Sequence, residues 1–243
     1  MRRPALLALM VLVGCGAGGR SGGGETTRPT ARAPAHVKEL PRVPGRRVTF
    51  PAPGGPVRAE LTSAGRHAPA VLLVHQFRSG KDEWDPFVPY LHRAGFATLA
   101  YTGRGGIDEK PLAREAAAAL RFLARRPEVD PRRLGIVGAS VGASTAALVM
   151  SQGAGRRVRA AVALSPPDAP LIFDLQSADR WHPHDVLFVS DRNEASSVAN
   201  AYPGPVRSRR LVTRVLGHGV VLLSDLTVRK AVLAWLAARV ARR

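Results

Sequence analysis

Short apolar runs alternate with longer amphipathic stretches along the chain from about Val48 onward. Two short apolar runs, 48–50 and 57–62, flank the turn-forming sequence Pro-Ala-Pro-Gly-Gly, which predicts an antiparallel pair of strands. Nearly uniform apolar strands are then expected at 68–75, 96–101, 133–138, 158–165, 186–190 and 210–216, and helices at 82–94, 111–125, 141–152 and 224–241. Apolar strands that alternate with helices are typical of a parallel sheet covered on both faces. We therefore predict an α/β fold with a doubly wound, mostly parallel, eight-stranded sheet.

The first 45 residues follow a different pattern. A basic start at residues 1–3 precedes an apolar stretch at 5–13, and the sequence Leu-Val-Gly-Cys closes that stretch at Cys15. This is typical of a secretory signal peptide and is too short to span a bilayer as a mature helix. Residues 16–45 are rich in Gly, Pro and Arg, which predicts a flexible tether.

The ending at Cys15 resembles the lipobox of bacterial lipoproteins. That resemblance implies cleavage before Cys15, lipidation of this cysteine, and anchoring in the cell envelope with the protein facing the periplasm or the exterior. An ordinary signal peptide with an incidental cysteine is the alternative. The expected segments are a signal peptide at 1–14, a lipidated cysteine and tether at 15–45, and one globular domain at 46–243.

The net charge of the chain bears on whether it binds nucleic acid. The chain carries 36 Lys plus Arg against 18 Asp plus Glu, a formal net charge of +18. The arginines form neither a run nor a basic stripe interleaved with aromatic residues, so nucleic acid is not an expected partner. Cys15 is the only cysteine, which excludes a disulfide within the chain.

The sequence Gly-Ala-Ser-Val-Gly around Ser140 is the central chemical signal. It lies directly between a predicted strand and a predicted helix. A serine on such a sharp turn has strained dihedral angles and an exposed hydroxyl, and its small neighbours avoid steric collisions. The start of the helix also directs backbone N–H groups toward charge that develops beside the serine. We therefore predict that Ser140 is a nucleophile.

An acid and a histidine follow Ser140 in the chain order Ser, Asp, His, which accompanies the Gly-x-Ser-x-Gly turn in enzymes with a catalytic triad. Asp191 ends a predicted strand, so its carboxylate is expected at the carboxyl edge of the sheet and is our predicted triad acid. Asp168 is the main alternative and Glu194 a weaker one. His218 lies between two glycines after the last predicted strand, where it can act as general base and then as general acid.

Taken together, these motifs resemble an α/β-hydrolase over about residues 47–243. The nearest branch is that of the compact dienelactone-hydrolase-like and serine-peptidase-like esterases. The resemblance implies an oxyanion hole built from two backbone N–H groups, those of Phe77 and Val141, with Gln76 as the alternative first donor. Gln76 replaces the glycine that this branch commonly has after its histidine, here His75, which we interpret as structural. Dienelactone hydrolases proper use a cysteine, so Ser140 argues against that specific activity.

Two further features limit the chemistry. The connection 165–185 is short, which predicts an open site without a large lid and a small or exposed acyl substrate. His182, His184 and Asp185 do not make a closed metal site, so neither a metal nor another cofactor is expected. The sequence predicts a serine hydrolase of the carboxylesterase type. The alternatives are a non-catalytic, lipid-anchored protein of the same fold and an acyltransferase with the same triad.

Overall fold

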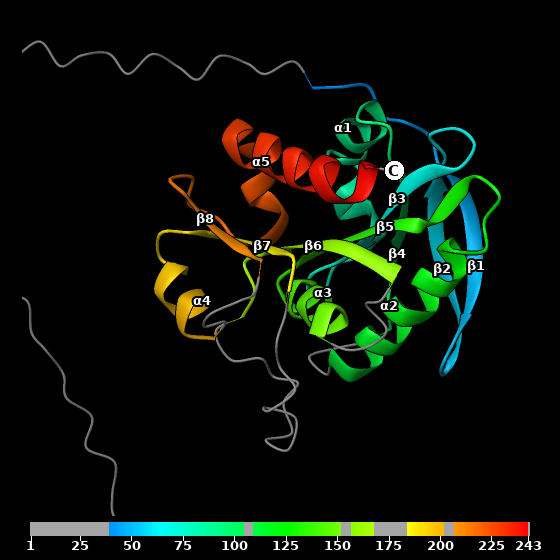
Figure 1. The fold of residues 1–243 in the computed structure, drawn as a ribbon. Helices are drawn as coiled ribbons and strands as arrows, with labels where there is room; N and C mark the ends of the chain where they lie inside the picture. The colour runs from blue at the N-terminus through cyan, green and yellow to red at the C-terminus, as the bar shows by residue number, and fades with distance from the viewer. Residues whose placement is uncertain (1–38, 105–108, 152–156, 168–183, 202–206, 243) are drawn as a thin grey trace, which may run out of the picture. The chain divides into compact units, whose positions relative to one another are not determined.

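One sheet of eight strands runs through the described part of the chain in the order β1-β2-β4-β3-β5-β6-β7-β8 (Figure 1). The computed structural model describes residues 39–104, 109–151, 157–167, 184–201 and 207–242. The strands are β1 (Arg46–Ala52), β2 (Gly55–Thr62), β3 (Ala68–Val74), β4 (Ala97–Tyr101), β5 (Val129–Ala139), β6 (Val158–Leu164), β7 (Val186–Asp191) and β8 (Arg209–Thr213).

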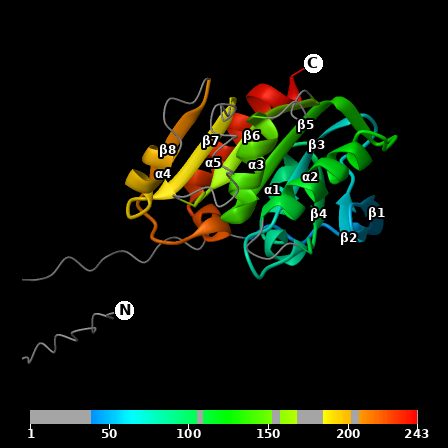
Figure 2. The same cartoon turned by 90° about the horizontal axis from the view of Figure 1, so that it is seen from below.

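The pairing of these strands confirms the predicted sheet. β1 and β2 form an antiparallel pair, and β2 also lies antiparallel to β4. All other neighbours, from β4 to β8, are parallel. Figure 2 shows these parallel strands side by side, with β1 and β2 at one end of the sheet.

Helices cover both faces of the sheet (Figure 1). The side chains of β3 explain why, because successive residues of a strand point to opposite faces. Ala70, Leu72 and Val74 belong to the core that includes α2 (Glu109–Leu123) and α3 (Val141–Ser151). Val71 and Leu73 belong to the second core, with α1 (Val88–Arg93) and α5 (Leu226–Leu236). Because β3 is apolar on both faces, its side chains are buried only if helices cover both faces of the sheet.

Two predicted helices have different bounds in the structure. The predicted helix at 82–94 is divided into a 3-10 turn at Lys81–Trp84 and α1. A proline in the interior of a helix clashes with the preceding turn, whereas the first turn of a helix accepts it. The helix α1 accordingly begins so that Pro89 lies in its first turn. The final helix α5 begins at Leu226, since the carboxylate of Asp225 caps it by accepting the N–H of Thr227 at 2.7 Å.

The remaining elements are short. A 3-10 turn at Gly219–Ser224 precedes α5, and a π-helical turn at Ala237–Ala241 follows it. The helix α4 (Ala195–Ala201) follows β7 and was not predicted. Its sequence Ala-Ser-Ser-Val-Ala-Asn-Ala places one buried apolar side chain, Val198, in a stretch too short for an amphipathic pattern.

Several sequence predictions fall on residues that the structure does not describe. The predicted signal peptide, Cys15 and most of the tether lie within 1–38, and Asp168 and His182 lie within 168–183. None of the helices in the described ranges combines the length and the hydrophobicity that a membrane span requires.

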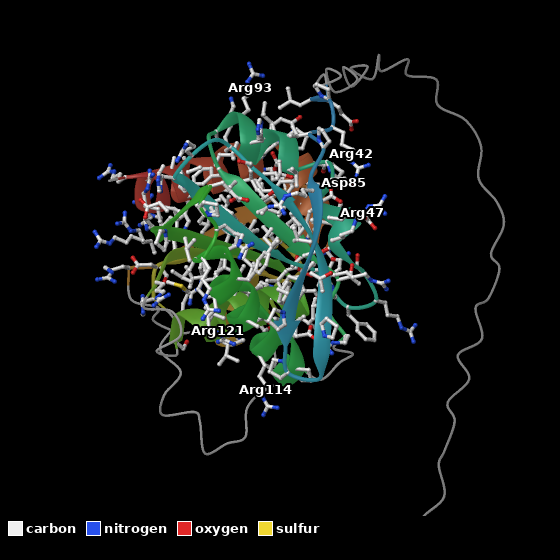
Figure 3. All side chains as sticks on the ribbon, turned by 90° about the vertical axis from the view of Figure 1, so that its right-hand side faces the viewer. Arg42, Arg47, Asp85, Arg93, Arg114 and Arg121 are labelled. Carbon is white, nitrogen blue, oxygen red and sulfur yellow. The ribbon has the colours of Figure 1, made fainter. Side chains whose placement is uncertain are left out.

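The arginines of the described surface are spread over different elements. Arg47 on β1, Arg93 on α1 and Arg114 and Arg121 on α2 point away from the body of the protein (Figure 3). Arg42 differs from them because its guanidinium lies 3.2 Å from the carboxylate of Asp85. Exposed pairs of this kind contribute little to stability.

Candidate active site

Ser140 occupies a strained turn between the end of β5 and the start of α3. Its φ is +52°, in the left-handed region that residues other than glycine seldom adopt. Three backbone hydrogen bonds fix this turn: the N–H of Ser140 donates to the carbonyl of Leu164 at 2.9 Å, and its own carbonyl accepts from Ala143 and Ser144. The surrounding backbone therefore holds Ser140 in a conformation that it would not adopt alone.

The two glycines that flank Ser140 are required by close backbone contacts. A Cβ atom on Gly138 would lie 1.9 Å from the carbonyl oxygen of Gly142. A Cβ atom on Gly142 would lie 2.3 Å from the carbonyl oxygen of Val74, at the end of β3. Backbone atoms cannot move aside as a flexible side chain can, so the sequence Gly-x-Ser-x-Gly is a steric requirement of this turn.

His218 follows β8 and directly precedes the 3-10 turn at Gly219–Ser224. Gly219 has a φ of +62°, and a Cβ atom placed on it would lie 3.4 Å from the Cβ of Ala139 and 2.1 Å from Oε1 of Gln76. The histidine loop therefore packs against both the serine turn and the segment after β3. The structure brings the three segments that carry Ser140, His218 and Gln76 to the carboxyl edge of the sheet, where active sites of parallel sheets lie.

The carboxylate nearest the ring of His218 belongs to Glu194. Oε1 of Glu194 lies 2.6 Å from Nδ1 of His218. This short contact fits a hydrogen bond in which the ring N–H donates to a carboxylate. The second oxygen, Oε2, is buried and has no hydrogen-bond partner among the described residues. Glu194, a weaker alternative in the sequence analysis, therefore makes the contact with the His218 ring that we expected of Asp191.

Asp191 lies at the end of β7 as predicted, but its carboxylate bonds to the backbone. One oxygen accepts the N–H groups of Asn193 and Glu194 at 2.9 and 3.0 Å, and the other accepts the N–H of Gly217 at 3.3 Å. Burial raises the pKa of Asp191, but these three donors outweigh burial and leave the pKa below its ordinary value. Asp191 thus connects the turn that carries Glu194 with the loop that carries His218.

Asp191→Asn tests this connection through its pH dependence. A lowered pKa in the folded state stabilises the protein above the ordinary carboxyl pKa, and the stabilisation is lost as the pH falls through the folded value. We expect the variant to have a Tm lower by about 3–6 °C at pH 7, which corresponds to roughly 1–2 kcal/mol. Thermal unfolding followed by circular dichroism should show this difference shrinking below about pH 4. A difference that stays constant down to pH 3 would contradict the role of the charge.

The segment after β3 contains Gln76 and Phe77, the two alternatives for the first oxyanion donor. The N–H of Gln76 already donates to Oε1 of Glu83 at 3.0 Å, while the N–H of Phe77 has no acceptor within the residues described. Glu83 is largely buried, and this burial raises the pKa of its carboxyl group. Its bond to Gln76 fixes the backbone next to Phe77, a function that no sequence motif indicated.

His75 is fully engaged in holding neighbouring loops. Nδ1 lies 2.7 Å from the carbonyl oxygen of Gln76, and Nε2 accepts the N–H of Gly103 at 2.9 Å. These partners require the neutral ring with its proton on Nδ1. The interpretation of His75 as a structural residue agrees with these contacts, because neither ring nitrogen is available to a substrate.

Apolar side chains are exposed beside the site. Phe77 follows Gln76, and Leu216 and Val221 lie on the two sides of His218; between 38% and 53% of the surface of each residue is exposed. In the part of the chain that the structure describes, no group of three His, Cys, Asp or Glu residues is arranged to hold a metal ion. The described edge of the site therefore offers apolar surface next to a serine and a histidine–carboxylate pair.

The strand order, the strained serine between a parallel strand and a helix, and the histidine loop after the last strand are the features of the α/β-hydrolase class. A family model described as the alpha/beta hydrolase fold matches residues 69–193, more than half of the chain, and the protein belongs to this family. No curated protein matches the sequence.

Solved structures of this fold are similar to the chain at low sequence identity. A dienelactone hydrolase from Anabaena variabilis is 16% identical, with a TM-score of 0.65 over 81% of this chain and 98% of that one. A thermostable carboxylesterase from a metagenomic library is 19% identical, with a TM-score of 0.62 over 82% and 88%. An esterase from Pyrococcus furiosus is 16% identical, with a TM-score of 0.64 over 81% and 91%. At these identities the likeness establishes the fold.

Proposed function

We propose that the protein is a serine hydrolase that cleaves a carboxylic ester or a related acyl bond through Ser140, His218 and Glu194. The observation that carries this proposal is the contact of 2.6 Å between His218 and Glu194, in which His218 belongs to the loop that packs against the turn of Ser140. A nucleophile, a base and a group that orients the base are the three parts that covalent acyl transfer requires. Esterases among the structural neighbours agree with this class of reaction.

In the first half of the reaction, Nε2 of His218 takes the proton of the Ser140 hydroxyl as its oxygen attacks the acyl carbon. The tetrahedral intermediate then collapses, the bond to the leaving oxygen breaks, and His218 gives its proton to the leaving alcohol. In the second half, His218 takes a proton from water, the resulting hydroxide attacks the acyl-enzyme, and Ser140 is released with its proton restored. Glu194 keeps the proton of the neutral ring on Nδ1 and stabilises the imidazolium that forms twice in each cycle.

The oxyanion of each intermediate is expected to bind the N–H groups of Phe77 and Val141. Val141 is the first residue of α3, and the first N–H groups of a helix have no partner within the helix. The N–H of Gln76 is occupied by Glu83, which favours Phe77 as the other donor. Donors fixed in this way stabilise a developing negative charge without further reorganisation.

The apolar side chains beside the site favour an acyl group with some hydrocarbon character. Leu216 and Val221 flank His218, and exposed apolar surface next to a site is typical of a surface that binds apolar ligands. A short-chain ester such as p-nitrophenyl butyrate is therefore a suitable first substrate.

Labelling with a fluorophosphonate tests the function directly. The full-length protein is incubated with the probe, digested and analysed by mass spectrometry, and hydrolysis of p-nitrophenyl butyrate is measured in parallel. We expect ester turnover, and an adduct on the peptide that contains Ser140. A folded protein that neither turns over the ester nor takes up the probe would contradict the proposal and favour a non-catalytic member of the family. Transfer of the acyl group to added butanol in preference to water would instead indicate an acyltransferase.

A further inference from the structure

A hollow lies at the edge of the sheet opposite Ser140. It has a volume of about 770 Å³ and opens to solvent. Its polar lining consists of Arg66, His67, Asp130, Arg132, Arg133 and Arg159. These residues lie at or just before the amino ends of β3, β5 and β6, whereas Ser140 lies at the carboxyl end of β5. The hollow is therefore separate from the candidate active site, and its volume is in the range of pockets that bind small ligands.

Irregular backbone surrounds this hollow. Ala68 of β3 pairs with Val129 of β5, but Ala70 pairs with Leu134, so the four residues 130–133 of β5 lie opposite the single residue Pro69 of β3. A second irregularity lies between β5 and β6, where Arg159 is the extra residue. Bulges of this kind redirect side chains and are features of functional sites more often than defects. Here they present Arg132, Arg133 and Arg159 toward one hollow.

Two of the lining residues, Arg133 and Asp130, form an ion pair, and Arg133 also bonds to backbone carbonyls around the hollow. Nε of Arg133 donates to Oδ2 of Asp130 at 2.8 Å, and its two other nitrogens donate to the carbonyls of His67 and Ala241. The other oxygen of Asp130 accepts the N–H of Arg132 at 2.9 Å. The only acidic side chain of the lining is thus already paired.

The other three arginines leave the hollow with an uncompensated positive charge. The exposed guanidinium groups of Arg66 and Arg132 form no hydrogen bond or ion pair among the described residues, although the charge of Arg132 helps to lower the pKa of Asp130. Arg159 donates to the carbonyl of Arg242 at 2.5 Å. His67 adds a ring that can donate a hydrogen bond, and its φ of +50° is again in the left-handed region. A hollow lined mainly by charges of one sign concentrates ions of the opposite sign, here anions.

We propose that this hollow binds a phosphate group. The planar guanidinium of arginine matches the oxygens of phosphate with two parallel hydrogen bonds, and several such forks around one hollow favour an anion that carries more than one charge. The phosphate can belong to a small soluble compound or to the headgroup of an anionic phospholipid. The predicted lipid anchor at Cys15 would keep the protein next to the phospholipids of a membrane.

The test compares two matched double variants of the full-length protein. Arg66→Gln/Arg132→Gln removes two charges from the hollow. Arg114→Gln/Arg121→Gln removes the same charge from α2, where both side chains point into solvent (Figure 3). Binding of inorganic pyrophosphate is measured by titration calorimetry, and binding to phosphatidylglycerol vesicles is measured by cosedimentation, with phosphatidylcholine vesicles as the reference. Circular dichroism verifies that both variants are folded.

We expect the hollow variant to bind pyrophosphate at least about tenfold more weakly than the wild type, and the α2 variant to bind as the wild type does. If the hollow variant also binds phosphatidylglycerol vesicles more weakly than the α2 variant does, the phosphate of a lipid headgroup also enters the hollow. If the two variants differ only in binding pyrophosphate, the ligand is a soluble phosphate compound. Equal weakening in the two double variants would overturn the proposal, because binding would then depend on net charge alone. Absence of binding to both probes would overturn it as well.

Discussion

Ser140→Ala is expected to abolish ester hydrolysis, with a loss of kcat on the order of 10⁶-fold, the effect of removing the nucleophile from a serine hydrolase. Alanine keeps the Cβ of Ser140 and removes only the hydroxyl oxygen, which is the proposed nucleophile. The backbone bonds of this residue, to Leu164, Ala143 and Ser144, do not involve the hydroxyl. The variant should therefore fold normally, and its Tm should lie within a few degrees of the wild-type value.

Residual activity separates this prediction from its alternatives. Hydrolysis of p-nitrophenyl butyrate is measured under saturating substrate, together with uptake of the fluorophosphonate probe. A variant that keeps more than a tenth of the wild-type rate while folding normally would exclude Ser140 as the nucleophile. Such a result would also assign the adduct expected in the labelling experiment to another residue.

Glu194→Gln is expected to lower kcat by about 10²–10⁴-fold, because the amide cannot stabilise the imidazolium of His218 and can bind the ring in the wrong tautomer. The matched variant is Asp191→Asn, which also exchanges one carboxylate for an amide of the same size. Asp191 bonds to three backbone N–H groups, so its loss is expected to disturb the position of His218 and to lower kcat by about tenfold.

The ratio of the two effects assigns the triad acid. Steady-state kinetics of both variants on one ester gives kcat and KM, and thermal unfolding shows whether either effect reflects loss of structure. If Asp191→Asn loses far more activity than Glu194→Gln in a folded protein, Asp191 is the acid and the contact between Glu194 and His218 is incidental. Equal losses would mean that the two carboxylates act as one unit.

The sheet could be predicted from the sequence because its strands are apolar at nearly every position. Residues 68–74 and 158–164 contain no stretch of polar residues, so these segments are not mistaken for loops. The serine turn could be predicted as well, since Gly138 and Gly142 are steric requirements that any sequence with this turn must meet. Local patterns of this kind do not depend on where distant parts of the chain lie.

The partner of His218 depends on distant parts of the chain and could not be chosen from the sequence. Asp191 and Glu194 are three residues apart, and either could reach a histidine on a neighbouring loop. The choice follows from the turn itself: Asp191 accepts the N–H groups of its own turn, as Asp often does, and Glu194 at the start of α4 is left to face the ring. Sequence patterns contain both options, and only the assembled loops select one.

The meeting of three segments at Gly219 has a consequence for how activity returns after denaturation. Gln76, Ala139 and Gly219 come from the early, middle and late parts of the chain, and they meet only after β3, β5 and β8 have taken their places in the sheet. Contacts between residues so far apart in sequence form slowly, because the long intervening chain must first be ordered. A refolding chain should therefore recover helical structure well before it recovers the proposed hydrolase activity, and the rate of that activity would report on the last tertiary contacts to form.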